Sequence, residues 1–431
     1  MSGPINERLC CALGGALPAV TSLHRFVPVV HAGPGCGLQT FFSQAYGSGF
    51  HGSTYVGGVS IPSSNTYERE VVFGGEGRLR EELKGTLNVM DGDAFVVLTG
   101  CTSALIGDDV SAVVQEFKGR AKIAYAEVSG FKGNTYYGYD AVWEALAGQL
   151  VEPSRKVRNR VNLFGVVPTQ DIFWKGNLNE IKRLLELLGL EVATFYTRRQ
   201  GLNTVLSASS AALNIVLSPY LARSAVETLE KRFGTPTLRF PYLPIGPTAT
   251  AEFLTRVAGA LKIPNAKLKT ILAAEHAEVY DALTEAALSL TAFQLQKRVA
   301  LVGDSNTVAG LIHFLADDLG HFPELAIVTD QPPEDVTKEI AKSITKLRYA
   351  DAPEVLFLND QEDSDAALRR VKPELVFGST LDKDIARELH ATHLSVSFPI
   401  TDRLILDRAY AGNRGSICLL EDIMTAFVST L

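Results

Sequence analysis

Short apolar runs rich in β-branched residues recur along the whole chain, and longer segments with helical periodicity separate them. Each run ends in Gly, Ser or Asp before the next helical segment begins. This alternation is typical of repeated βα units whose parallel strands are buried on both faces. We therefore predict an α/β protein with strands at ten positions: 26–33, 94–100, 122–128, 161–168, 213–219, 298–304, 325–330, 354–360, 373–380 and 392–399.

Two breaks in this pattern divide the chain. Residues 151–160 form a charged, proline-containing stretch, and a second basic stretch at 294–298 precedes a new strand. The same βα pattern restarts after each break. We expect three Rossmann-like α/β domains, with parallel sheets flanked by helices. Their expected ranges are 1–158, 159–296 and 297–431, the last with a C-terminal helical segment.

Two local patterns refine this picture. Ile181, Leu184, Leu185 and Leu188 recur at helical spacing, which predicts a core helix that leads into a further strand. The turn at 303–304 follows a strand much as nucleotide-binding folds begin, but the full glycine fingerprint is absent. We interpret it as an ordinary βα turn.

Composition narrows the class of protein. The chain has 431 residues, 46% of them hydrophobic, which is enough for several buried cores. It contains no apolar run of membrane-spanning length and no clear signal peptide, so we expect no membrane insertion or secretion. A net charge of −7 with interspersed acids and bases argues against nucleic-acid binding. Five cysteines without dense spacing fit thiols in a reducing cytoplasm.

Three of these cysteines lie in glycine-rich turns at strand-to-loop junctions. They are Cys10 in LCCALGG, Cys36 in HAGPGCG and Cys101 in LTGCTSALIGDD. Glycine-lined turns let the backbone fold closely around a bulky inorganic group while the thiolates point inward. A single buried cysteine often packs as a small hydrophobe. Three in matching surroundings instead indicate ligands of a metal cluster, so we expect the first domain to bind one.

Several segments, taken together and in this order, resemble component 1 of nitrogenase and its relatives. The resemblance runs over nearly the whole chain, and such a series is highly specific. The segments are LCCALGGAL, VVHAGPGCG, VVFGGEGRLREEL, TGCTSALIGDDV, GFKGNTYYGYD, PIGPTATAEFL, RVALVGDSNTVAGLIHFL, PELVFGST and VSFPITDRLILDRAYAGNRG.

The resemblance implies a shared iron–sulfur site. In that family an α-type and a β-type chain, each with three α/β domains, hold a P-cluster (8Fe-7S) with three cysteines from each side. The matching positions here are Cys10, Cys36 and Cys101. Cys11 remains an alternative to Cys10, because ALGGAL favours Cys10 whereas the spacing to Cys36 favours Cys11. Ser129 lies near the place where β-type chains present a serine to the oxidised cluster, although a plain turn serine is also compatible.

The β-type is favoured by what this sequence lacks. The α-type chain of the family holds the catalytic iron–sulfur cofactor with a further cysteine and a late histidine. Ser218 stands at that cysteine position here, and neither His390 nor His393 matches the histidine. Serine is a poor substitute for a thiolate as an iron ligand. We interpret Cys418, in an apolar helical run, as a packing residue.

The same resemblance also implies partners. They are an α-type chain in an α2β2 heterotetramer, and an ATP-dependent iron protein with a 4Fe-4S cluster. Electrons would pass through the P-cluster to the catalytic cofactor in the partner chain, so we expect no activity from this chain alone. His31 is expected to orient the Cys36 loop or to bond a cluster sulfur, and Asp108 and Asp109 to cap helices.

The substrate is the least constrained part of the hypothesis. The compact length and the three-cysteine β-type pattern favour a methylthio-alkane reductase, which cleaves carbon–sulfur bonds reductively. A nitrogen-fixing nitrogenase (Mo, V or Fe-only) and a cofactor-assembly scaffold remain alternatives. The protochlorophyllide reductase type is disfavoured, because its β-like chain has an aspartate in place of a cysteine. Binding proteins and nucleotide-sugar transferases also use repeated α/β domains, but they have no need of the three cysteines.

Overall fold

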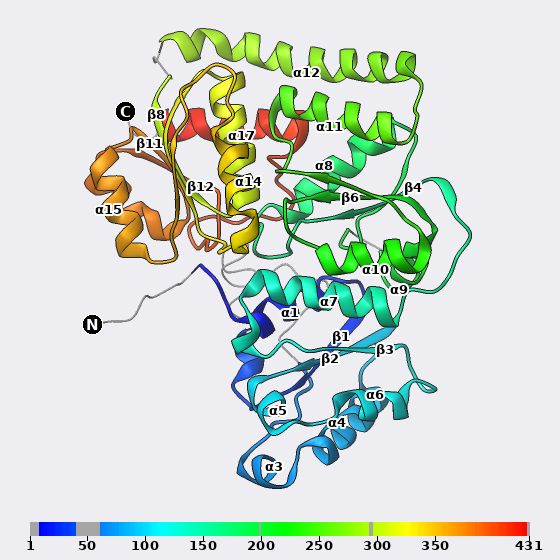
Figure 1. Ribbon diagram of the computed structural model, residues 1–431. Coiled ribbons are helices and arrows are strands. Elements are labelled where there is room, and N and C mark those ends of the chain that lie inside the picture. Colours follow the sequence, from blue (N-terminus) through cyan, green and yellow to red (C-terminus); the bar gives the residue numbers. More distant parts are fainter. Residues whose placement is uncertain (1–7, 40–60, 198–199, 293–295, 429–431) are drawn as a thin grey trace.

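Three parallel sheets follow one another along the chain (Figure 1). The computed structural model describes residues 8–39, 61–197, 200–292 and 296–428. Each of the ten predicted positions contains a strand. The structure therefore confirms the α/β fold with parallel sheets flanked by helices.

The first sheet has the order β1-β2-β3 and carries the cysteine-rich part of the chain. Its strands are β1 (Phe26–His31), β2 (Ala94–Thr99) and β3 (Ile123–Ala126). All residues of β1 and β2 are buried, because helices cover both faces of the sheet. One face packs on α4 (Glu76–Val89) and α6 (Val110–Phe117), and the other on α1 (Ala12–Thr21) and α7 (Thr135–Gln149). Two further short helices are described in this part, α3 (Glu68–Phe73) and α5 (Cys101–Ile106).

Helices α1 and α7 cross with their backbones in contact. A Cβ atom on Gly15 of α1 would lie 2.0 Å from the carbonyl oxygen of Thr135, and one on Gly138 of α7 would lie 2.0 Å from that of Ala12. Only glycine permits so close an approach. This crossing fixes the start of α1, and with it Cys11, against the start of α7.

The second sheet has the order β5-β4-β6-β7. Its strands are β4 (Val157–Phe164), β5 (Glu191–Ala193), β6 (Ala211–Leu217) and β7 (Thr237–Phe240). The predicted core helix is α8 (Trp174–Leu187), in which Ile181, Leu184 and Leu185 are buried. The other helices are α9 (Leu202–Leu206), α10 (Arg223–Phe233), α11 (Gly246–Ala260) and the long α12 (Asn265–Ala292).

The third sheet is doubly wound, with the order β10-β9-β8-β11-β12. Its strands are β8 (Arg298–Gly303), β9 (Phe322–Val328), β10 (Glu354–Phe357), β11 (Leu375–Gly378) and β12 (Thr392–Ser395). Its helices are α13 (Ser305–His313), α14 (Glu334–Thr345), α15 (Gln361–Val371), α16 (Lys383–Glu388) and α17 (Gly412–Val428). At the 303–304 turn, Asp304 accepts hydrogen bonds from the backbone N–H groups of Asn306 and Thr307 and so caps α13.

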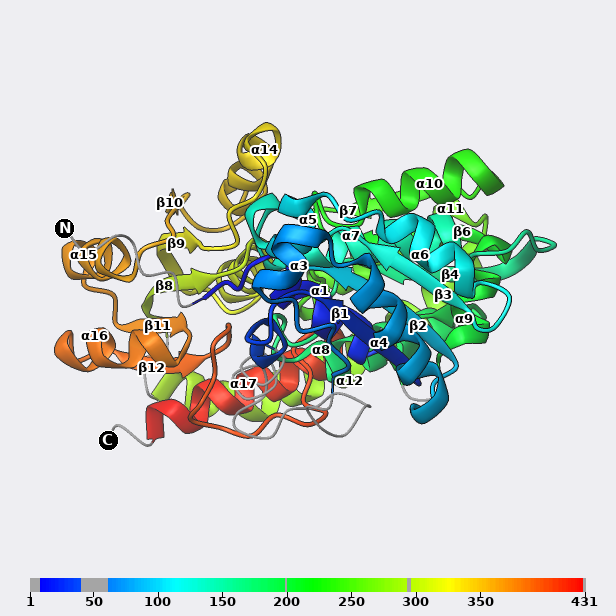
Figure 2. The same cartoon turned by 90° about the horizontal axis from the view of Figure 1, so that it is seen from below.

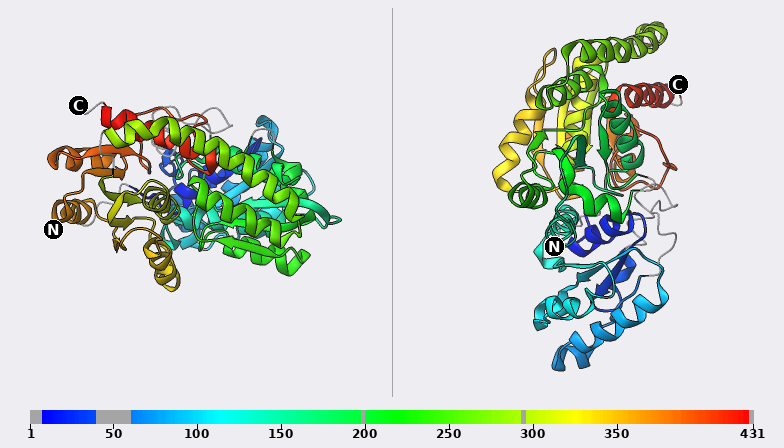
Figure 3. Two further views of the ribbon diagram at one scale, coloured as in Figure 1. Left: turned by 90° about the horizontal axis from the view of Figure 1, so that it is seen from above. Right: turned by 90° about the vertical axis from the view of Figure 1, so that its right-hand side faces the viewer.

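The proposed domain ranges remain a prediction. Strand β4 begins at Val157, just before the proposed boundary after residue 158, and β8 begins at Arg298, just after the second one. The C-terminal helix α17 packs on α8, α11 and α12, so it belongs as much to the second unit as to the third. Figure 3 shows the first sheet at one end of the molecule and α12 at the other. Within the described ranges, no helix combines the length and apolar character needed to cross a bilayer.

Candidate metal centre

Cys36 lies beyond the carboxyl end of β1. The chain leaves the sheet at His31 and turns into the short helix η1 (Cys36–Leu38), where the Cys36 backbone N–H donates to the carbonyl oxygen of Gly33 (3.2 Å). The side chain is half-buried. Because carboxyl ends of parallel strands share one edge of the sheet, this places Cys36 beside the residues that come after β2.

Cys101 is the first residue of the helix after β2. Gly100, just before it, lies so close to the β1 segment that an added Cβ would be 2.3 Å from the Cβ of Ala32. The Cys101 side chain is exposed, and its sulfur accepts a hydrogen bond from the Gly130 backbone N–H (3.2 Å). Two cysteines of the predicted set therefore leave the same edge of the first sheet.

The third cysteine at this edge is Cys11, the N-cap residue of α1. The point that a Cβ on Gly130 would occupy lies 3.2 Å from the Cys101 sulfur and 3.3 Å from the Cys11 sulfur. The two sulfurs are therefore separated by at most the sum of these distances. Cys11 also donates a hydrogen bond from its sulfur to the side-chain oxygen of Gln39 (3.2 Å).

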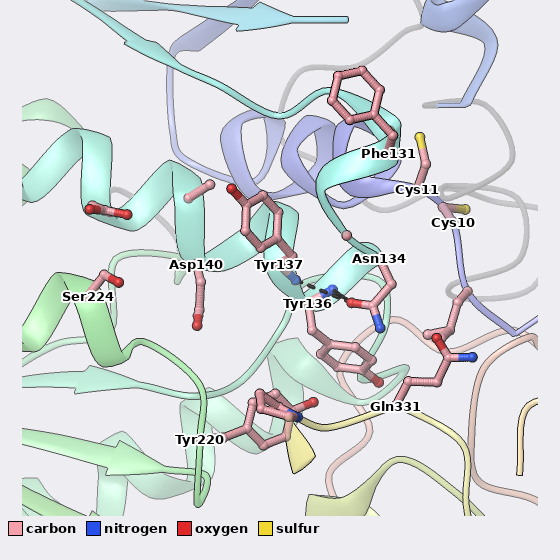
Figure 4. Close-up of a pocket in the computed structure, with 16 residues that line it drawn as sticks. Cys10, Cys11, Phe131, Asn134, Tyr136, Tyr137, Asp140, Tyr220, Ser224 and Gln331 are labelled. Atoms are coloured by element: carbon pink, nitrogen blue, oxygen red, sulfur yellow. Dashed lines mark hydrogen bonds between the residues drawn. The ribbon is translucent and has the colours of Figure 1, made fainter. Parts of the chain in front are cut away.

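Cys10 precedes Cys11 and lines the same pocket. Its backbone N–H donates to the Thr135 hydroxyl oxygen (2.8 Å), and its Cβ lies against Gly14 in the first turns of α1. Figure 4 shows the sulfurs of Cys10 and Cys11 pointing in different directions. The physical reason is that α1 begins immediately after Cys11, so the helix start turns the two neighbouring side chains apart. The structure places Cys11 beside Cys101, and Cys10 and Cys11 both line the pocket next to Gly130. The choice between Cys10 and Cys11 as the first ligand stays a prediction.

The Cys36 thiol is affected by its burial and by its neighbours. Burial raises the pKa of the Cys36 thiol, and the neighbouring Cys101 and Cys11 thiols raise this pKa further. A raised thiol pKa means that the metal-free chain holds Cys36 protonated at neutral pH. A bound cation would reverse this balance by stabilising the thiolate.

Ser129 immediately precedes Gly130, the residue that contacts the Cys11 and Cys101 sulfurs, and it carries an unusual hydroxyl. The residue precedes the short helix η2 (Gly130–Lys132), is fully buried, and its Oγ has no hydrogen-bond partner in the described structure. A buried hydroxyl without a partner costs free energy. The Ser129 hydroxyl oxygen is therefore available to a bound group. That it supplies an oxygen to such a group stays a prediction.

The residues present fit an iron–sulfur cluster by their chemistry. Iron in such clusters takes thiolate ligands, and three thiols and a free hydroxyl oxygen are available here. Gly130 leaves open the space between two of the sulfurs. In the described parts of the chain, no group of three or more His, Cys, Asp or Glu side chains is arranged to hold a single metal ion.

Exposed apolar side chains lie on the elements that carry Cys36 and Cys101 and on neighbouring elements. Val72 and Phe73 on α3, Leu105 on α5, Leu38 after Cys36 and Phe131 after Gly130 are each more than half exposed. Helices α3 and α5 contact each other, and Figure 2 shows them side by side. Contiguous exposed apolar patches are a feature of interaction surfaces. We call these five residues the apolar rim.

Other sequence interpretations have clear outcomes. Ser218, at the position of the α-type cysteine, is buried, and its hydroxyl oxygen accepts hydrogen bonds from the backbone N–H groups of Tyr220 and Leu221. Cys418 is half-buried in α17, and burial raises its thiol pKa. Asp109 caps α6, as predicted, by accepting from the Ala112 N–H (2.9 Å).

Gln39 and Gly130 were not identified from the sequence. Gln39 follows Cys36 closely but lacks a recognisable motif, and its contact with Cys11 bridges distant parts of the chain. Gly130 lies within SGFKG, which was recognised as a segment but not as a contact between two cysteines. Only the three-dimensional arrangement reveals both.

These features define an α/β protein of three parallel sheets that presents a cluster of thiols within an apolar rim. The chain belongs to the nitrogenase component 1 type oxidoreductase family, since the model of that family matches residues 11–428.

Named relatives agree with this assignment. The nitrogenase molybdenum-iron protein beta chain of Methanococcus maripaludis is 26% identical, over 97% of this chain and 93% of that one. The corresponding beta chains of Frankia alni and Azotobacter vinelandii are 25% and 24% identical, over 99% of this chain in both cases and over 83% and 84% of theirs. The solved structure titled "Nitrogenase Cp1 at pH 6.5" superposes with a TM-score of 0.80 at 22% identity, covering 100% of this chain and 94% of that one.

Proposed function

We propose that this chain is the β-type subunit of a nitrogenase-like reductase. In this proposal Cys11, Cys36 and Cys101, together with three cysteines of an α-type partner, hold a P-cluster-type (8Fe-7S) cluster. The complex is an α2β2 heterotetramer in the cytoplasm, reduced by an ATP-dependent iron protein with a 4Fe-4S cluster. The catalytic iron–sulfur cofactor resides in the partner, so the isolated chain is inactive.

One observation carries the proposal. Thiols from three separate elements, the start of α1, the loop after β1 and the start of α5, lie at one edge of the first sheet. The apolar rim supports a partner that closes over this edge and removes it from water.

The cluster would supply one-electron acceptance and donation, and the protein tunes its potential through burial and hydrogen bonds. This chain contributes the thiolates and a close backbone approach at Gly130, whose N–H donates to the Cys101 sulfur. Hydrogen bonds to a ligating sulfur are among the factors that set such a potential. Ser129 has a hydroxyl oxygen without a hydrogen-bond partner beside Gly130, and this oxygen would be available to a bound cluster as a further ligand.

The β-type assignment rests on Ser218 and on the relatives' names. Ser218 is engaged in a turn and presents a hydroxyl where an α-type chain has a thiolate, so this chain offers no ligand for the catalytic cofactor at that position. The relatives named above are all beta chains.

Two substrate classes remain in the proposal. Methylthio-alkanes are the first, from the three-cysteine β-type pattern of the sequence. Dinitrogen is the second, and the names of the relatives favour it. A cofactor-assembly scaffold is the non-catalytic alternative, and three available thiols argue against it.

The metal hypothesis is tested by co-purifying the chain with its partner without oxygen and measuring iron content and electron paramagnetic resonance. Alanine variants of Cys11, Cys36 and Cys101 should each lose the signal of an interfacial cluster. Cys10→Ala and Cys418→Ala are matched controls that should retain it. Wild-type complex without iron at the interface would refute the proposal, and loss in Cys10→Ala with retention in Cys11→Ala would return the ligand to Cys10.

The substrate is tested on the same complex with the iron protein, ATP and a reductant. Methanethiol released from a small methylthio-alkane would establish carbon–sulfur cleavage, whereas ammonia formed from dinitrogen would establish nitrogen fixation. If an iron-loaded complex forms neither product, the scaffold alternative is favoured.

A further inference from the structure

A fully buried histidine connects the two cysteine-bearing elements of the first sheet. His31 is the last residue of β1, and both of its ring nitrogens have partners. Nδ1 lies 2.8 Å from the hydroxyl oxygen of Ser64, and Nε2 lies 2.9 Å from a carboxylate oxygen of Asp108. Neither partner is a cysteine. The sequence expectation that His31 orients the backbone thus has a specific structural form.

Asp108 is held on both sides. One carboxylate oxygen faces His31, and the other accepts the backbone N–H of Gly75 at the start of α4 (2.7 Å). The Asp108 backbone N–H donates to the carbonyl oxygen of Ser103 within α5 (3.2 Å). Asp108 therefore fixes the end of the helix that begins with Cys101.

The backbone of His31 holds the other end of the same helix. Its carbonyl oxygen accepts the N–H of Gly100 (2.9 Å) and the hydroxyl of Ser103 (2.7 Å). His31 thus contacts α5 near its first residue through the main chain and beyond its last residue through the ring. From His31 the chain continues directly through the turn to Cys36, so one residue constrains both cysteines.

The chemistry of the partners sets the hydrogen-bond roles. An ionised carboxylate only accepts, so the Asp108 contact places the ring proton on Nε2 and leaves Nδ1 to accept from the Ser64 hydroxyl. Burial lowers the pKa of His31, and the hydrogen bond to Asp108 opposes that change. The neutral ring satisfies both contacts. A leucine would satisfy neither, whereas a glutamine retains a donor for Asp108.

We propose that His31 is a positioning residue that, through Asp108 and its own carbonyl oxygen, fixes the spacing between the Cys36 and Cys101 sulfurs. This positioning role of His31 rests on the proposed function, in which the Cys36 and Cys101 sulfurs are cluster ligands. The spacing itself is a property of the metal-free chain and is measurable there.

The first measurement uses phenylarsine oxide, a trivalent arsenical that bridges two neighbouring thiols. The full-length, metal-free chain carries Cys10→Ser and Cys11→Ser, so that Cys36 and Cys101 form the remaining neighbouring pair. Because losing a hydrogen bond to a charged group shifts an equilibrium by about tenfold or more, His31→Leu and Asp108→Leu should each bind the arsenical about tenfold more weakly. His31→Gln should restore most of the affinity, and His276→Gln, on the exposed face of α12, should leave it unchanged.

The second measurement uses the complete complex. The midpoint potential of the interfacial cluster should shift in His31→Leu and return towards the wild-type value in His31→Gln. The proposal would be overturned if both leucine variants bind phenylarsine oxide as tightly as the Cys10→Ser/Cys11→Ser chain. It would also be overturned if His31→Leu loses affinity for the arsenical and His31→Gln does not restore it. An iron-free wild-type interface would instead refute the proposed function, and the arsenical result would still decide the positioning role.

Discussion

The crossing of α1 and α7 provides the sharpest test of how the fold positions the site. Gly138 lies in α7, and a Cβ at this position would be 2.0 Å from the Ala12 carbonyl oxygen and 2.7 Å from the Ala16 backbone nitrogen. Both obstacles are main-chain atoms of α1, so no side-chain rotation relieves them. Gly138→Ala therefore forces the two helices apart.

These distances set the size of the destabilisation that Gly138→Ala should cause. Real Cβ contacts are essentially never shorter than 3.0 Å, so α1 must move by about 1 Å relative to α7. Overpacking of this kind costs about 1–3 kcal/mol, and the better helix propensity of alanine offsets about 1 kcal/mol of it. We expect a net loss of up to about 2 kcal/mol in the free energy of unfolding.

The same helix contains a matched control. A Cβ at Gly148 of α7 meets nothing within 4 Å, so Gly148→Ala should be neutral or stabilising by up to about 1 kcal/mol. Urea unfolding followed by tryptophan fluorescence suits this comparison, because Trp143 lies in α7 and the other tryptophan, Trp174, begins α8. A Gly138→Ala chain as stable as Gly148→Ala would refute the reasoning.

Buried charges and one close contact give three further predictions. Arg8 and Asp382 form a buried ion pair (2.6 Å), so Asp382→Ala should cost about 3–5 kcal/mol in the free energy of unfolding, because it leaves Arg8 buried without its carboxylate. In urea unfolding, an Arg8→Met/Asp382→Leu double variant that is less stable than Asp382→Ala would contradict this prediction. Burial raises the pKa of Asp140 to about 7. The contribution of this group to stability is therefore fully present below about pH 4 and is lost as the pH rises towards 7. Asp140→Asn should therefore gain about 1–2 kcal/mol relative to wild type between pH 5 and pH 8, after allowance for its partial exposure, and a pH-independent melting difference would contradict this. Gly130→Ala would place a Cβ 3.2 Å from the Cys101 sulfur and should lose most interfacial iron, and full iron content would refute that close approach.

The fold was predictable because buried parallel strands read as continuous apolar runs. Strands such as Ala94–Thr99 and Arg298–Gly303 contain few polar residues and end in glycine or a hydroxyl residue. Strand β7 (Thr237–Phe240) was missed, since it has four residues, contains an arginine and has only its last residue fully buried. Short, half-buried strands depend on their neighbours for pairing and carry little pattern of their own.

The site was predictable in residue type but not in detail. Glycine-rich surroundings favoured Cys36 and Cys101 as ligands, because such turns permit close backbone approach, and that role stays a prediction. The choice between Cys10 and Cys11 depends on where α1 begins, and no local motif fixes that position. Asp108 was expected only to cap a helix, and its contact with His31 joins residues far apart in the sequence. Long-range side-chain contacts of this kind arise from sheet topology, which a single sequence does not contain.

Two different structural devices bring the three thiols together. Cys36 and Cys101 lie at the same edge of the sheet because β1 and β2 are parallel neighbours, with Val29 paired to Val97, so that their carboxyl ends lie side by side. His31 joins the segments beyond both strands. Cys11 reaches the same place through helix packing, since the glycines of α1 and α7 let Ala12 lie directly on Gly138. A substitution at the helix crossing should therefore displace Cys11 alone, whereas one at His31 should disturb Cys36 and Cys101 while sparing Cys11. The thiol reactivities of the Gly138→Ala and His31→Leu chains should show opposite patterns for this reason.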